Sequence, residues 1–204
     1  MDPKKLIDLI ILSCKKSIAP EFNLKLLKGG GYNILHYVVE GASDAVNNNQ
    51  ESVKVLKWFD NFWLFLEIRF RLLQNKNIRK DEIYISLSVF HGNDLDCKKR
   101  QLFRAEWDDY GSLDEKTHAQ PHWHVSSNQE TEKTFNKNFD DDFEDFSQTK
   151  SEKQNIVDVS KIHFAMVGDW QNTGKHAHMM ESEEQIVKWL QGMLNHLRSE
   201  LKNL

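Results

Sequence analysis

The chain has 204 residues, of which 39% are hydrophobic and 28% charged, and its formal net charge is −4. This composition supports a globular core and excludes collagen-like, wholly disordered and disulfide-scaffold proteins. The acidic balance argues against a generally basic nucleic-acid-binding surface, although a local basic patch remains compatible with it. The only cysteines, Cys14 and Cys97, have no partner at metal-ligand spacing, which favours a reduced, cytoplasmic setting.

Both ends of the chain are predicted to be helical. Asp2 and Pro3 have the pattern of an N-cap followed by proline at the first helical position, which predicts a helix over 3–17. Near the other end, Ser182 and Gln185 have the spacing of a capping box. A regular apolar stripe follows them, so a long final helix is expected.

A third helix is predicted over 51–74, where large apolar residues recur at helical spacing. The same region contains the longest apolar stretch of the chain, 58–73. Asp60, Glu67 and Arg69 interrupt that stretch, which argues against a membrane span. No membrane association is therefore expected.

Five segments have the composition or alternation of β-strands, and four of them alternate apolar with polar residues. An antiparallel sheet covered on one side produces this alternation. We therefore predict a single α+β domain over 1–204, with a mostly antiparallel sheet of about five strands and helices packed on one face. The predicted strands are 32–40, 82–91, 101–109, 121–127 and 161–167.

Residues 128–155 differ from the rest of the chain because they are polar and acidic. Four phenylalanines recur in this segment at helical spacing, and aliphatic residues are scarce. We expect a mobile acidic insertion between two strands. The segment is either a surface helix laid against the core or an acidic-aromatic element that docks on a partner or covers the protein's own site.

Two predicted strands carry side chains that suit a metal ion. His122 and His124 are two residues apart on one strand, and Glu106 and Asp108 have the same spacing on the preceding strand. Each pair therefore projects from one face, and Trp107 and Trp123, which alternate with them, are expected to be buried on the other. If the strands form a hairpin, carboxylates and imidazoles lie on neighbouring positions of that face. Two histidines with a carboxylate are a common ligand set, and zinc or manganese is the expected ion.

Three further residues are given catalytic roles. His163 is the expected general acid or base, His118 lies in the loop between the two strands, and Arg104 is placed to steady a substrate anion. The favoured function is a metal-dependent hydrolase acting on a phosphodiester of nucleic acid. The alternatives are an ordinary polar sheet face and a non-catalytic module that binds another protein through 128–155. The oligomeric state stays open.

The same histidines allow a reading without metal. His124-Val125-Ser126 and His163-Phe164-Ala165 are strand-borne motifs of the form histidine, apolar residue, small residue. They resemble the paired motifs of the 2H phosphoesterases, in which one histidine is the general base and the other the general acid on an RNA or cyclic phosphate. Ala165 stands where that family has a hydroxyl residue. The resemblance covers six residues of the chain.

Overall fold

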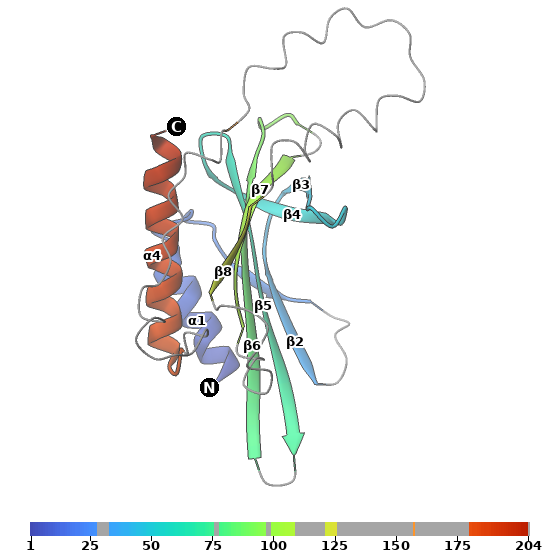
Figure 1. The fold of residues 1–204 in the computed structure, drawn as a ribbon, viewed down its shortest axis with the longest axis vertical. Coiled ribbons are helices and arrows are strands. Elements are labelled where there is room, and N and C mark those ends of the chain that lie inside the picture. Colours follow the sequence, from blue (N-terminus) through green and yellow to red (C-terminus); the bar gives the residue numbers. More distant parts are fainter. Residues whose placement is uncertain are drawn as a thin grey trace, which may run out of the picture.

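The computed structural model describes residues 1–27, 33–75, 78–96, 99–108, 121–125, 157 and 180–203. Two helices and eight strands lie in these ranges, as Figure 1 shows. The helices are α1 (Pro3–Cys14) and α4 (Glu183–Lys202). The strands are β1 (Leu24–Leu26), β2 (Ile34–Val39), β3 (Ser43–Val46), β4 (Ser52–Phe59), β5 (Phe62–Asn75), β6 (Ile78–His91), β7 (Lys99–Asp108) and β8 (His122–Val125).

The fold is α+β, and its sheet is larger than the five strands expected from the sequence. Eight strands form one mixed sheet, in which β3 and β7 run parallel and the other described pairs are antiparallel. The pairings of β5 with β4, β4 with β3, β3 with β7, β7 with β6 and β6 with β5 close a ring of five strands. The strand β8 lies outside this ring and pairs with β7.

The main core lies between the two helices and one face of the sheet. Figure 1 shows α1 and α4 side by side along the same side of the sheet. Leu6 and Ile10 of α1 and Leu190 and Leu197 of α4 have no exposed surface and belong to one apolar cluster with the sheet residues. Burial of this continuous apolar surface is the main stabilising term of the fold. The sheet contributes residues including Leu64, Leu66, Ile68, Ile83, Ile85, Leu87, Phe103, Ala105 and Trp107.

The opposite face of the sheet carries two different environments. Inside the ring of strands, a small second apolar cluster is built around Trp63 and Phe90. Lys57 and Lys99 place their ammonium groups 4.5 and 4.3 Å from the ring centroid of Trp63. Beyond this cluster most of the alternating positions are polar, and we call these polar residues the polar face. It comprises His36, Glu67, Arg69, Tyr84, Ser86, Ser88, Arg104, Glu106, Asp108, His122 and His124.

The predicted helix over 51–74 is wrong, because β4 and β5 form a hairpin there. Asp60 at the turn adopts a positive φ of 43°, a conformation that aspartate tolerates better than most residues. The first part of β5 is apolar on both sides, since Leu64 packs into the main core while Trp63 packs into the second cluster. A strand buried on both sides loses the period of two, and its apolar residues then match a helical pattern by chance.

Other expectations have mixed outcomes. The strands predicted over 32–40, 82–91, 101–109 and 121–127 are confirmed, whereas the segments 128–155 and 161–167 lie outside the described residues. The capping box of Ser182 is present, and Asp2 caps a first helix that ends at Cys14. Neither described helix is both long and apolar enough to cross a membrane.

Candidate metal site

The pairing of β7 with β8 brings three of the four predicted ligands together. The two strands are antiparallel, with Glu106 opposite His122 and Arg104 opposite His124. Trp107 faces the main core with 1% of its surface exposed, as expected. Trp123 was expected to be buried too, but it is half-buried and lies against Phe103, with ring centroids 6.1 Å apart. Alternation along both strands therefore turns the polar side chains to the opposite face.

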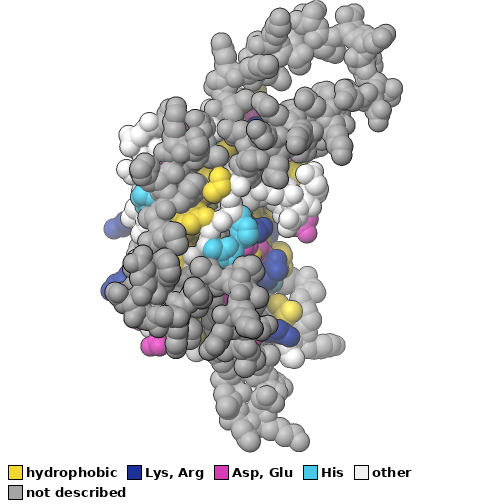
Figure 2. All heavy atoms as spheres, in the orientation of Figure 1, with side chains coloured by type: hydrophobic (Ala, Val, Ile, Leu, Met, Phe, Trp, Pro, Cys, Tyr) yellow, Lys and Arg dark blue, Asp and Glu magenta, His cyan; other side chains and the backbone are white. Residues whose placement is uncertain are grey.

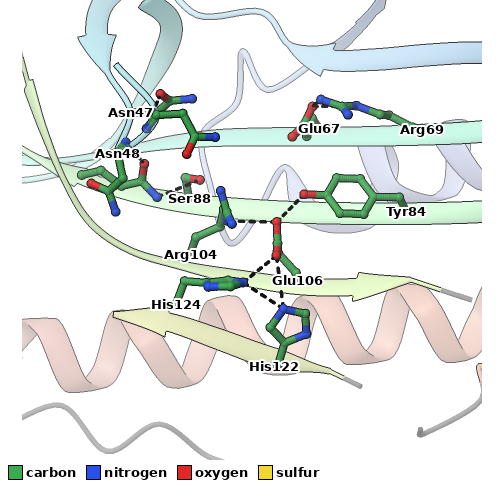
Figure 3. A network of polar contacts seen from close by, with 12 residues as sticks. Asn47, Asn48, Glu67, Arg69, Tyr84, Ser88, Arg104, Glu106, His122 and His124 are labelled. Atoms are coloured by element: carbon green, nitrogen blue, oxygen red, sulfur yellow. Dashed lines mark hydrogen bonds and ion pairs between the residues drawn. The ribbon is translucent and has the colours of Figure 1, made fainter. Parts of the chain in front are cut away.

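Three side-chain atoms converge at the centre of this site (Figure 3). Oε2 of Glu106 lies 2.8 Å from Nε2 of His124 and 3.2 Å from Nε2 of His122. The two Nε2 atoms are 2.9 Å from each other. Glu106 is buried, His122 is 24% exposed and His124 is 47% exposed. The site is thus closed on the side of the carboxylate and open on the side of His124.

Neutral imidazoles cannot satisfy all three contacts with hydrogen bonds. Each Nε2 carries at most one proton, and a neutral ring has one donor nitrogen and one acceptor nitrogen. If both Nε2 atoms donate to Glu106, the two N–H groups of His122 and His124 face each other at 2.9 Å and neither can accept from the other. If one histidine donates to the other, the accepting nitrogen has no proton for the carboxylate. A cation in the centre satisfies all three atoms at once.

The triangle formed by these atoms has the size of one face of a metal tetrahedron. A tetrahedral zinc ion with ligand distances of about 2.0–2.1 Å has its ligand atoms about 3.3 Å apart. The three edges here are 2.8, 2.9 and 3.2 Å. An ion placed roughly 1 Å above the plane of the triangle reaches all three atoms at bonding distance. Glu106, His122 and His124 can therefore hold a metal ion.

Tyr84 and Arg104 support the other oxygen of the carboxylate. The Tyr84 hydroxyl donates to Oε1 of Glu106, and Nε of Arg104 lies 2.9 Å from the same atom. Burial favours the neutral form of Glu106, but Tyr84, Arg104 and His124 outweigh it and hold the pKa of this carboxyl below its usual value. Burial and the neighbouring carboxylate raise the pKa of Tyr84. The site thus contains an ionised carboxylate beside a protonated phenol.

The remaining predicted site residues have different positions. Asp108 follows Glu106 on the same face of β7, opposite Tyr84 of β6, and it is not in the group of converging ligand atoms. Arg104 contacts Glu106 at the site, and its expected role toward a substrate anion stays a prediction. His118 and His163 lie outside the described residues. The described ligand set therefore consists of one carboxylate and two imidazoles.

Sequence reasoning gave Tyr84 no role in the site. The alternation of β6 placed it on the polar side of its strand, but nothing in the sequence indicated that β6 pairs with β7 in this register. The second missed feature is a pair on β2 and β5, where Nε2 of His36 lies 3.0 Å from Oε2 of Glu67. Arg69 also donates to that oxygen, at 2.7 Å. This pair has only one histidine and provides a natural control for the metal site.

Figure 2 shows the site from outside. Histidine side chains reach the surface over the middle of the sheet, with basic and acidic side chains beside them. Comparison with protein-family models, curated proteins and solved structures finds no match. The function is therefore inferred from the residues and their geometry.

Proposed function

We propose that Glu106, His122 and His124 hold a divalent metal ion, zinc or manganese, and that the protein is a metal-dependent hydrolase. The convergence of three ligand atoms within 3.2 Å of one another carries the proposal. Structural zinc sites usually have four protein ligands, whereas catalytic sites have three and leave a position for water. The described ligand set has three members and is open on the side of His124.

A water molecule at the open position is the proposed nucleophile. A bound divalent ion lowers the pKa of its water from 15.7 to about 7, so hydroxide is available near neutral pH. The half-exposed ring of His124 borders this position, which gives a substrate access from solvent. The buried carboxylate of Glu106 neutralises part of the metal charge from the opposite side.

A phosphodiester of nucleic acid is the substrate class that we propose. Arg104 is 24% exposed and adds a cation at the edge of the site, which suits an anionic phosphate. An ion held by Glu106, His122 and His124 would supply a nucleophilic hydroxide: as this oxygen bonds to phosphorus, the bond from phosphorus to the leaving oxygen would break, and the proton released from the ion's water would be returned to the leaving oxygen. The same ion stabilises the negative charge that develops on the phosphoryl oxygens.

The test is hydrolysis by the purified full chain loaded with zinc or manganese. Bis-4-nitrophenyl phosphate and short single- and double-stranded nucleic acids serve as substrates. Turnover is expected with at least one of the two metals. It should fall at least about 100-fold in Glu106→Gln and His122→Ala, because each variant loses a ligand.

His36→Ala is the matched control. His36 also contacts a glutamate on the polar face, at 3.0 Å, but it lies on β2, away from the group of converging ligand atoms. Its turnover should match that of the wild type. Equal turnover in the wild type, Glu106→Gln and His122→Ala, or no turnover of any phosphodiester, contradicts the proposed activity.

A further inference from the structure

We infer that the site selects zinc in a four-coordinate arrangement, with Glu106 contributing a single oxygen and with Tyr84 and Arg104 as positioning residues that enforce this. The inference rests on the metal binding proposed above and goes further, because it chooses between zinc and manganese. It also assigns a role to Tyr84, which is not among the ligands.

The two oxygens of Glu106 have separate sets of partners. Oε1 accepts the hydroxyl of Tyr84 and lies 2.9 Å from Nε of Arg104. Oε2 faces the two imidazoles, at 2.8 and 3.2 Å. A metal ion that took both oxygens would have to displace both partners of Oε1. Glu106 therefore offers one oxygen to the ion and uses the other to fix its orientation.

Both partners of Oε1 are held by the sheet. Tyr84 lies on β6 and Arg104 on β7, and the pairing of these strands extends from Tyr84 opposite Asp108 to His91 opposite Arg100, on both sides of Glu106. The guanidinium of Arg69 on β5 lies 5.4 Å from the ring centroid of Tyr84, so the ring is also contacted from the strand beyond. The carboxylate thus receives its orientation from three neighbouring strands rather than from a loop.

This arrangement suits zinc better than manganese or magnesium. Two imidazoles and a single carboxylate oxygen form a small, nitrogen-rich ligand set, and imidazole ligands favour zinc over the harder cations. Magnesium and manganese prefer octahedral shells dominated by oxygen, and calcium takes six to eight oxygens. With Oε1 engaged, Glu106 cannot supply the additional oxygen that those ions require.

Cobalt(II) can report the coordination number, because four-coordinate cobalt absorbs visible light far more strongly than six-coordinate cobalt. Metal-free full-length protein is titrated with cobalt(II), and zinc, manganese or magnesium is then added in competition. The expected result is the strong absorption of a four-coordinate ion, lost on addition of one equivalent of zinc and retained with manganese or magnesium at the same concentration.

Tyr84→Phe tests the positioning role. The variant frees one hydrogen-bonding position on Oε1, so the affinity for zinc should fall about 10–100-fold, as for other partners of metal ligands. The cobalt absorption should also weaken as the carboxylate turns to offer both oxygens.

Tyr37→Phe is the matched control, because Tyr37 packs on the core side of β2 against Phe70. This variant should leave the affinity for zinc and the cobalt spectrum unchanged. Arg104→Lys, which keeps the charge but loses Nε, should reproduce the spectral change if Tyr84→Phe does not fold.

The outcomes separate this inference from the proposed function. The weak absorption of six-coordinate cobalt, or displacement by manganese as effective as that by zinc, overturns the zinc inference while metal binding stands. A folded Tyr84→Phe with wild-type affinity and spectrum overturns the role of Tyr84. If none of these ions binds, the proposed function itself is overturned.

Discussion

Glu106 and His122 lie directly opposite each other in the register of β7 and β8. Their side chains meet because cross-strand neighbours on one face of an antiparallel pair have Cβ atoms about 4.5–5.5 Å apart. His124 reaches the same oxygen of Glu106 from two residues along β8. Sheet pairing alone therefore assembles the ligand group, and the ligands are held by backbone that is already ordered.

Trp107→Ala is expected to destabilise the protein strongly, because Trp107 is part of the main core. Trp107 follows Glu106 on β7, is 1% exposed and packs into the main core. Removal of such a side chain should lower the free energy of unfolding by about 3–5 kcal/mol. Denaturant unfolding followed by circular dichroism measures the change. Trp123→Ala is the comparison and should cost less, because Trp123 is half-buried; an equal or larger loss there would contradict the described packing.

The contacts of Glu67 with His36 and Arg69 predict that part of the protein's stability is lost at low pH. Burial favours the neutral form of Glu67, but His36 and Arg69 outweigh it and hold the pKa of this carboxyl below its usual value. Between the folded and unfolded pKa values the unfolded chain binds more protons. The stabilisation is therefore complete above the unfolded pKa of about 4.3 and is lost as the pH falls through the lower folded value.

Glu67→Gln tests this dependence in unfolding measurements at a series of pH values. The difference in free energy of unfolding between the wild type and Glu67→Gln should be greatest near neutral pH and should shrink on acidification below about pH 5. His36→Ala should show a smaller change than Glu67→Gln, since Arg69 still contacts the carboxylate. A difference that stays constant from pH 7 to pH 3 would contradict the lowered pKa.

The capping box of α4 predicts a moderate cost for Ser182→Ala. The Ser182 hydroxyl accepts the backbone N–H of Gln185 at 3.2 Å, and the Gln185 side chain accepts the backbone N–H of Ser182. Loss of the first bond should lower the free energy of unfolding by about 1 kcal/mol. Ser199→Ala, at an exposed position inside the same helix, should change it by less than about 0.5 kcal/mol. Equal effects of the two variants would show that the cap does not contribute.

The sequence predicts those elements whose pattern is local. The strands β6, β7 and β8 alternate because one side faces the helices and the other is polar, and α4 has both a cap and a stripe. The strand β3 was missed because it is short and half polar. Its position depends on a parallel pairing with β7, in which Ala45 lies opposite Lys99, and no local signal encodes such a contact.

The candidate site was predictable only in part for the same reason. The spacing of His122 and His124 is local, so their common face follows from the period of a strand. That Glu106 lies opposite His122 could be expected only by assuming that β7 and β8 pair with each other. The contact of Tyr84 with Glu106 depends on the register between β6 and β7. Asp108 has the same strand spacing as Glu106, but only the register shows that it lies opposite Tyr84, beyond the group of converging ligand atoms.

The metal content of the purified protein tests the central claim most directly. Plasma mass spectrometry of the wild type should find close to one zinc or manganese ion per chain. His122→Ala and His124→Ala should lose most of that metal while keeping the circular dichroism of the wild type, because both side chains face away from the main core and contribute little packing. His36→Ala should retain the metal. A wild type without metal, even after incubation with zinc and manganese, or full occupancy in both His122→Ala and His124→Ala, would contradict the account.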